Sequence, residues 1–203
     1  AGSIRDSAHI SYPYSRRYSK NYRGVCEETI MTRLELAKKG IITDEVKLVA
    51  ASEGLTPEQL SADIASGVSV IPINRNHPIT PIGIGRNMRT KINANIGTSK
   101  DRISIEEEME KLAVLVKYGA DAVMDLSTGG PIKELRQMML KKSPIAVGTV
   151  PIYEAIVKTV AQKGSIAKMT ADDLFAVIEE HAADGVDFVT AHAGLTMKAI
   201  ERL

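Results

Sequence analysis

Side chains that could bind a small polar molecule lie near the ends of segments that we expect to be β-strands. Asn95, Met124 and His192 fall at, near or just past such ends, and Tyr153 opens the helix after the third strand. An amide, a phenol and an imidazole can each form hydrogen bonds with a ligand, and a thioether can pack on its apolar face. The placement of these four side chains indicates one binding site.

Each of these residues also has a purely structural interpretation. Met124 on an otherwise apolar strand could fill the core, Asn95 could hydrogen-bond a neighbouring strand, and His192 could be a buried, hydrogen-bonded histidine. The loop Ser127-Thr128-Gly129-Gly130 precedes a helix and could offer backbone N–H groups to an anion. Short glycine loops are common at such turns, so this loop alone is weak support for a phosphate site.

The residues from 88 onward repeat a strand, a loop and a helix, which is typical of a parallel sheet built from βαβ units. The predicted strands are Lys91–Ile96, Asp121–Leu126, Ile145–Gly148 and Val186–His192. Four such units are half of a (β/α)8 barrel, and an open doubly wound sheet is the competing architecture. We expect an α/β fold that forms the first half of a TIM-like barrel and is preceded by short helices.

The alternation of side chains along the strands favours the barrel. In the first strand, Asn93 and Asn95 point one way while Ile96 points the other, so a polar set can face the lumen. In the fourth strand, Val186, Phe188 and His192 are expected to share a face that becomes polar toward its carboxyl end. Barrel active sites form at that end of the strands.

Capping signals place several of the helices. Thr56, Pro57 and Gln59 together predict a helix start with a capping box. Ser104 is expected to cap the helix after the first strand, with Glu107 completing its capping box. The apolar stripe of that helix, which should lie on the sheet, is Ile105, Met109, Leu112, Ala113 and Val116.

Three more helices are expected over Pro131–Lys142, Pro151–Gln162 and Thr170–Ala183, and a last one from Leu195. His181 should lie on an exposed helix face and His77 in a loop rich in turn formers, and neither is given a functional role. Pro72 limits the apolar run before that loop to an edge strand at most.

Composition narrows the class of protein. The chain has 203 residues, with 26 basic and 25 acidic side chains and a formal charge of +1. This balance gives no broad attraction to nucleic acid, and no apolar run is long enough to cross a membrane. One cysteine, Cys26, cannot form an internal disulfide or hold a metal cluster by itself. We expect no metal ligands in this chain and a reducing, cytoplasmic setting.

The chain divides into three parts on composition and pattern. Residues 1–30 hold four of the six tyrosines and little aliphatic periodicity, so we expect a disordered leader before a natural start at Met31. A nucleic-acid arm and a transit peptide are less favoured interpretations of that leader. Residues 31–87 form a helical region with a strand, and residues 88–203 form the first barrel half.

Five collinear stretches resemble the phosphomethylpyrimidine synthase, or ThiC, family of thiamine biosynthesis. They are KINANIGTS (91–99), SIEEEMEKL (104–112), YGADAVMDLSTGG (118–130), SPIAVGTVPIYEA (143–155) and GVDFVTAHAG (185–194). The resemblance runs from about Met31 to Leu203 and is similar to the short forms of the family. Residues 1–30 correspond to nothing in it.

The resemblance implies a radical S-adenosylmethionine enzyme that converts 5-aminoimidazole ribonucleotide into 4-amino-2-methyl-5-(phosphomethyl)pyrimidine. It implies a [4Fe-4S] cluster, S-adenosylmethionine and zinc as cofactors, and a homodimer when the chain is full length. Family members contact the substrate through an Asn, a Met, a Tyr and a His, which by position are similar to Asn95, Met124, Tyr153 and His192. The stretch before His192 is a few residues longer than the family pattern.

Much of the machinery that the resemblance implies is absent from this sequence. The family's later half carries the Ser-Arg-Gly-Gly loop, the metal-binding histidines and the three-cysteine cluster motif. We therefore expect the 203-residue chain to be a truncated front part, inactive alone and with unpaired sheet edges. Two alternatives stay open, namely a 5-hydroxybenzimidazole synthase that uses the same substrate and a non-catalytic ligand-binding half-barrel.

Overall fold

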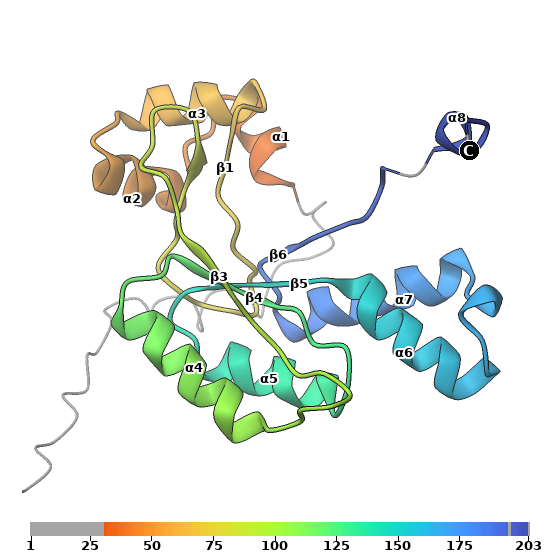
Figure 1. Cartoon of the computed structure of the whole chain (residues 1–203). Coiled ribbons are helices and arrows are strands. Elements are labelled where there is room, and N and C mark those ends of the chain that lie inside the picture. Colours follow the sequence, from red (N-terminus) through yellow and green to blue (C-terminus); the bar gives the residue numbers. More distant parts are fainter. Residues whose placement is uncertain (1–30, 195, 203) are drawn as a thin grey trace, which may run out of the picture.

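The computed structural model describes residues 31–194 and 196–202 (Figure 1). The predicted leader over residues 1–30, with Cys26 and four of the tyrosines, lies outside these residues. The described part begins with three short helices, α1 (Arg33–Lys38), α2 (Asp44–Glu53) and α3 (Pro57–Ala65). A hairpin of β1 (Ser69–Val70) and β2 (Ile84–Gly85) follows them.

The capping box predicted at the start of α3 is confirmed. Gln59 N donates to Thr56 Oγ1 over 3.2 Å, and Thr56 N donates to Gln59 Oε1 over 3.0 Å. The three helices bury one apolar cluster against the start of the chain segment that leads to the sheet. Its buried members are Ala37, Val46, Val49, Ala50, Leu60, Ile64 and Ile71. This small core holds the three helices of the N-terminal unit together.

The main sheet holds four parallel strands in the order β3-β4-β5-β6. They are β3 (Asn93–Ile96), β4 (Ala122–Asp125), β5 (Ala146–Thr149) and β6 (Phe188–Val189). The helices between and after them are α4 (Ile105–Lys117), α5 (Ile132–Lys142), α6 (Pro151–Lys163), the short 3-10 turn η1 (Ile166–Lys168), α7 (Ala171–Asp184) and α8 (Met197–Ile200).

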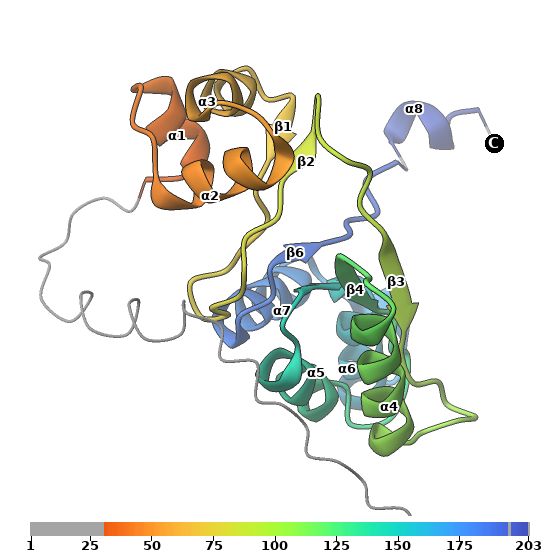
Figure 2. The ribbon, with the colours of Figure 1, turned by 90° about the vertical axis from the view of Figure 1, so that its left-hand side faces the viewer.

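Helices α4 to α7 lie on one side of the sheet, and the N-terminal unit lies on the other (Figures 1 and 2). The predicted parallel α/β architecture is therefore confirmed. The parallel sheet holds four strands within the described residues, so closure into a (β/α)8 barrel stays a prediction. Among residues 31–194 and 196–202, none of the helices combines the length and apolar character that a membrane span requires.

The last strand is shorter than the sequence pattern predicts. β6 covers two residues, which pair with Gly148 and Thr149, and the ladder ends where Thr190 N donates to Thr149 O over 2.8 Å. The reason is that β5 leads directly into α6 at Pro151, so residues after Thr190 meet no further strand backbone. The predicted strand 186–192 is thus wrong at both ends.

The core between the sheet and its helices contains Ile96, Leu112, Val123, Leu135, Met139, Leu140, Val147 and Val186. Val186 belongs to this helix side, whereas Phe188 packs with the cluster on the opposite face, so the two residues do not share a face as predicted. On α4, Ala113 is exposed and Leu115 packs against the core in its place. The other four residues of the predicted stripe, Ile105, Met109, Leu112 and Val116, pack in this core, so the prediction is wrong at one position.

Ser104 caps α4 as predicted, since its hydroxyl accepts from Glu107 N over 3.2 Å. The capping box is not completed, because Glu107 pairs instead with Arg102, whose Nε lies 2.8 Å from Glu107 Oε2. A guanidinium that can form two hydrogen bonds competes well with a single backbone N–H for one carboxylate.

A buried histidine and aspartate join the segment before the sheet to its last two strands. His77 Nδ1 lies 2.6 Å from Asp187 Oδ2, and His77 Nε2 lies 3.1 Å from Ser143 O. Asp187 also accepts from Asn74 N and Val147 N, each over 2.8 Å. The carboxylate therefore holds together three segments that are far apart in the sequence. Sequence reasoning placed His77 in a loop without a role, and its role is structural.

We predict that His77→Ala lowers the free energy of unfolding by about 3 kcal/mol, because the buried Asp187 carboxylate loses a close partner. Urea denaturation of the purified chain measures this loss. Lys47→Ala, which removes an exposed ion pair with Asp44, serves as the control and should change the value by less than about 0.5 kcal/mol. An equal, small effect of both substitutions would contradict this account of His77.

Candidate functional site

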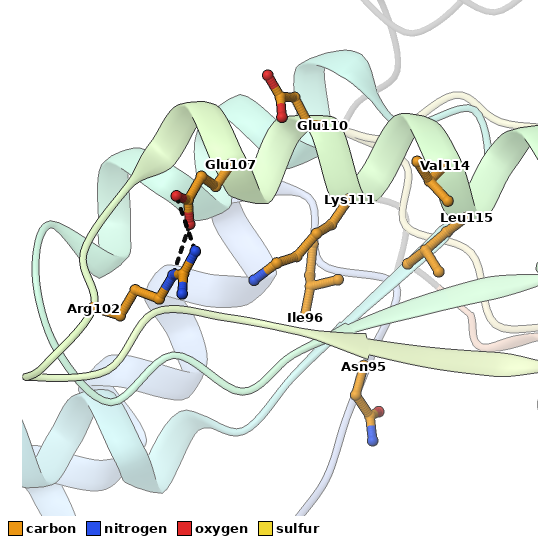
Figure 3. A pocket seen from close by; sticks show the side chains of 8 residues that line it. All are labelled: Asn95, Ile96, Arg102, Glu107, Glu110, Lys111, Val114 and Leu115. Atoms are coloured by element: carbon orange, nitrogen blue, oxygen red, sulfur yellow. Dashed lines mark hydrogen bonds and ion pairs between the residues drawn. The ribbon is translucent and has the colours of Figure 1, made fainter.

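The strand register places two of the predicted site residues side by side. Asn95 on β3 is the register partner of Met124 on β4, and Met124 is the partner of Gly148 on β5. Register partners in parallel strands project to the same face of the sheet. Figure 3 shows the amide of Asn95 pointing away from α4, while Ile96 points toward that helix. Asn95 and Met124 therefore share the sheet face opposite the helices.

Gly148 continues this row without a side chain. A Cβ atom at Gly148 would come within 2.4 Å of the Phe188 ring, which lies against the glycine. Any larger residue would have to displace that ring or the strand. The row across the sheet therefore runs from an amide to a thioether to a glycine covered by an aromatic ring. The Met124 side chain is buried, at 7% exposure, and Asn95 is exposed.

The other two predicted residues contact each other through their rings. The centroids of Tyr153 and His192 are 5.8 Å apart, with an interplanar angle of 37°. Tyr153 lies in the first turn of α6, directly after β5, and His192 lies three residues after β6. The structure thus brings the four predicted residues to the carboxyl end of the sheet as two pairs, Asn95 with Met124 and Tyr153 with His192.

Two backbone N–H groups of the glycine loop after β4 already form hydrogen bonds within the protein. Ser127 N donates to Asp125 Oδ1 over 2.9 Å, and Thr128 N donates to Thr98 O over 2.8 Å. The Ser127 hydroxyl also receives a bond from Thr98 N over 3.0 Å. These two of the loop's four backbone N–H groups are therefore not free for an anion.

Sequence reasoning missed a buried polar network beneath this edge of the sheet. Arg136 on α5 is fully buried; its Nη1 bonds to Glu154 on α6, and its Nη2 lies 2.7 Å from Asp184 Oδ2 on α7. His181 is 2% exposed, so its predicted place on an exposed face is wrong. One sequence signal was present, because Arg136 stands midway between the buried Ile132 and Leu140 at a spacing of one helical turn.

His181 contacts both ends of the turn that carries Tyr153. Its Nδ1 lies 2.8 Å from Thr149 Oγ1, at the end of β5. Its Nε2 lies 2.7 Å from Glu154 Oε2, the residue that follows Tyr153. With Nε2–H donating to the carboxylate, Nδ1 is left to accept from the hydroxyl. One imidazole thus joins Thr149, at the end of the strand, to Glu154, five positions later in the first turn of the helix.

The charge balance of this network favours an ionised Glu154. Burial raises the pKa of the Glu154 carboxyl, but hydrogen bonds from His181 and Lys158 and the charge of Arg136 lower it to about 2. Asp125, by contrast, has a pKa raised by burial, which its hydrogen bonds from Ser127 only partly offset. Glu154 therefore stays ionised to a lower pH than an ordinary glutamate, whereas Asp125 binds a proton at a higher pH than an ordinary aspartate.

A groove of about 490 Å³ runs between the free edge of β3 and α4 (Figure 3). Its polar wall includes Arg102, Glu107, Glu110 and Lys111. Asn95 borders this groove but turns its amide to the other face of the strand, so the groove is separate from the row of Asn95 and Met124. The groove marks the sheet edge on which no strand is paired within the described residues.

The described residues offer no metal centre. Within residues 31–194 and 196–202, no three His, Cys, Asp or Glu side chains are grouped so that they could hold a metal ion. The two pairs of predicted site residues consist of an amide, a thioether, a phenol and an imidazole. Those groups suit a small organic ligand with polar and planar parts.

Comparison with known proteins relates this α/β chain of parallel βα units to one family. A sequence model of the "Radical SAM ThiC family" matches residues 32–203. Proteins named phosphomethylpyrimidine synthase are similar to the chain: that of Thermodesulfovibrio yellowstonii is 61% identical over 173 residues, and that of Moorella thermoacetica is 54% identical over 174 residues. The protein of the same name from Pyrococcus furiosus is 48% identical over 174 residues.

The chain belongs to the radical SAM ThiC family. Each of these three alignments covers 85% of this chain but only 40% or 41% of the relative. The chain thus spans about two fifths of the length of the curated relatives that it matches. The resemblance identified from the five sequence stretches is confirmed.

The lowered pKa of Glu154 predicts a specific acid response. A carboxyl group whose pKa falls on folding stabilises the fold above its ordinary pKa of 4.5, and this contribution is lost as the pH falls toward 2. Glu154→Gln should lower the free energy of unfolding by about 3 kcal/mol at pH 7, because Arg136 is left buried without this charged partner. At pH 2 the difference between the two proteins should largely disappear.

Urea denaturation between pH 7 and pH 2 measures this response. Glu58→Gln, at an exposed carboxyl group in the first turn of α3, is the matched control and should leave the pH profile unchanged. If the free energies of unfolding of wild type and Glu154→Gln differ by the same amount at every pH between 7 and 2, the buried partners do not lower the pKa of Glu154.

Proposed function

We propose that the complete protein containing this chain converts 5-aminoimidazole ribonucleotide into 4-amino-2-methyl-5-(phosphomethyl)pyrimidine, a precursor of thiamine. The observation that carries the proposal is the match to the radical SAM ThiC family over residues 32–203. The 61% identity to a protein named phosphomethylpyrimidine synthase supports it. This chain contributes part of the substrate-binding surface, and the remaining length of the enzyme contributes the rest of the reaction machinery.

The substrate-binding residues are Asn95, Met124, Tyr153 and His192. The shared sheet face of Asn95 and Met124 and the ring contact between Tyr153 and His192 support this assignment. Asn95 can donate to and accept from a ribose or imidazole edge, and Met124 can pack on the face of the heterocycle. Tyr153 and His192 can hydrogen-bond the ribose phosphate or the substituents of the ring.

The four βα units are the first half of a (β/α)8 barrel. The parallel order β3-β4-β5-β6, with helices α4 to α7 on one side, supports this architecture. In the complete protein, further strands would pair with the free edges of β3 and β6 and enclose the face that carries Asn95 and Met124. Residues 31–87 then form a separate unit before the barrel half that begins at residue 88.

The cofactors of the reaction are S-adenosylmethionine and a [4Fe-4S] cluster, and zinc is a further metal. Together the first two supply a 5′-deoxyadenosyl radical that abstracts hydrogen from the substrate. The residues of this chain do not fit the cluster, because cluster ligation requires several thiolates and Cys26 is the one cysteine in the sequence. Cluster and zinc ligands therefore belong to the rest of the enzyme, which we expect to be a cytoplasmic homodimer.

A 5-hydroxybenzimidazole synthase that acts on the same ribonucleotide is the second candidate. The names of the similar proteins favour the thiamine precursor over it. Identification of the product by mass spectrometry, after reaction of the complete enzyme with 5-aminoimidazole ribonucleotide, separates the two. A phosphomethylpyrimidine supports the proposal, and a benzimidazole overturns it in favour of the second candidate.

His192→Ala in the complete protein should weaken binding of 5-aminoimidazole ribonucleotide at least tenfold, equivalent to about 1.4 kcal/mol. Isothermal titration calorimetry without S-adenosylmethionine measures the affinity directly. Lys141→Ala, at an exposed position in the last turn of α5, is the control and should bind like the wild type. Unchanged affinity and turnover of His192→Ala would remove that residue from the site.

A further inference from the structure

The turn between β5 and α6 has an unusual anchor. Helix α6 begins at Pro151, and its N-cap residue, Val150, provides no side-chain hydrogen bond to the first turn. The first turn of a helix normally gains such a bond from a polar cap. Here the turn is held instead from below, through the contacts of Thr149 and Glu154 with His181 on α7.

These contacts flank Tyr153. Thr149 precedes it by four residues and Glu154 follows it directly, so the His181 imidazole closes a bridge beneath the segment that carries the phenol. All three bridge residues are buried, with exposures of 2% for Thr149, 3% for Glu154 and 2% for His181. Buried hydrogen bonds of this kind resist exchange with water and restrict the backbone that they join.

Arg136 fixes the bridge to the rest of the helical layer. Its guanidinium contacts Glu154 on α6 and Asp184 on α7. The planar guanidinium sets the spacing between two carboxylates on different helices. A shift of α6 relative to α7 at this end would break more than one of these contacts at once.

The same two helices are joined at their other end by a weaker contact. Lys163, in the last turn of α6, lies 2.5 Å from Asp173, in the first turn of α7, with side chains 34% and 28% exposed. This ion pair is remote from Tyr153 in the sequence of α6 and is open to water. It provides a natural comparison for the bridge.

We propose that His181 and Arg136 are positioning residues that hold Tyr153 against His192. The bridge fixes the first turn of α6, and the phenol projects from that turn to the imidazole of His192, 5.8 Å away between centroids. His181 and Arg136 act on the ligand only through Tyr153. This inference rests on the proposed function where it concerns substrate, but the placement of Tyr153 can be tested without substrate.

The first experiment follows Tyr153 by ¹⁹F NMR in the full chain labelled with 3-fluorotyrosine. Tyr153→Phe identifies its resonance among the six tyrosines of the sequence, and His192→Ala calibrates the effect of losing the ring contact. His181→Gln keeps a donor for Glu154 but loses the bond to Thr149, and Thr149→Val removes the same bond from the other side with little change in volume.

Both substitutions should shift the Tyr153 resonance by more than its linewidth, and the double variant should shift it no further, because one bond is lost in all three. Lys163→Ala, which breaks the distant contact between the same helices, should leave the Tyr153 resonance in place. If His181→Gln fails to fold, as judged by circular dichroism, Thr149→Val decides the test alone. An unmoved Tyr153 resonance in the folded bridge variants overturns the inference.

The second experiment measures steady-state kinetics in the complete enzyme. His181→Gln should raise KM for the ribonucleotide about tenfold, equivalent to about 1.4 kcal/mol, with a smaller effect on kcat. A fall in kcat with unchanged KM would contradict a positioning role in substrate binding. If Tyr153→Phe and His192→Ala both bind the ribonucleotide normally, the proposed site fails, while the NMR result still decides whether the bridge places Tyr153.

Discussion

The parallel register of β3, β4 and β5 is the constraint on which the rest of the structure depends. Because all the strands run the same way, the loops that follow them leave the sheet at one edge, and side chains with the same register share one face. Asn95 and Met124 become neighbours through this register alone, although 28 residues separate them in the sequence. The same geometry places Tyr153 directly beyond β5.

The helical side of the sheet combines an apolar core with a polar network at one end. An apolar contact between helices tolerates sliding, whereas the guanidinium of Arg136 meets carboxylates on α6 and α7 in one arrangement. Buried ion pairs contribute little net stability compared with apolar residues of similar size. The value of this network therefore lies in fixing the first turn of α6 against the last turn of α7, and the turn before α6 is the segment most affected.

The sequence predicted the elements better than their contacts. Thr56 and Gln59 form their capping box because the signal is local, and the parallel strands follow from the repeated strand and helix pattern. The end of β6 depends on where β5 stops, and the burial of His181 depends on its hydrogen-bond partners Thr149 and Glu154, which are 32 and 27 residues away. Local spacing holds no information on such partners. The two pairs of site residues were placed by the family resemblance together with strand position, and their joint role in binding stays a prediction.

The bond between His77 and Asp187 joins residues 110 positions apart. During synthesis, the segment around His77 leaves the ribosome long before its aspartate has been translated, and Ile79 then has no completed sheet to cover. The segment around His77 and Ile79 must therefore avoid contact with other chains while more than a hundred further residues are added. Chaperone binding to this interval would protect the chain until the second half of the sheet emerges.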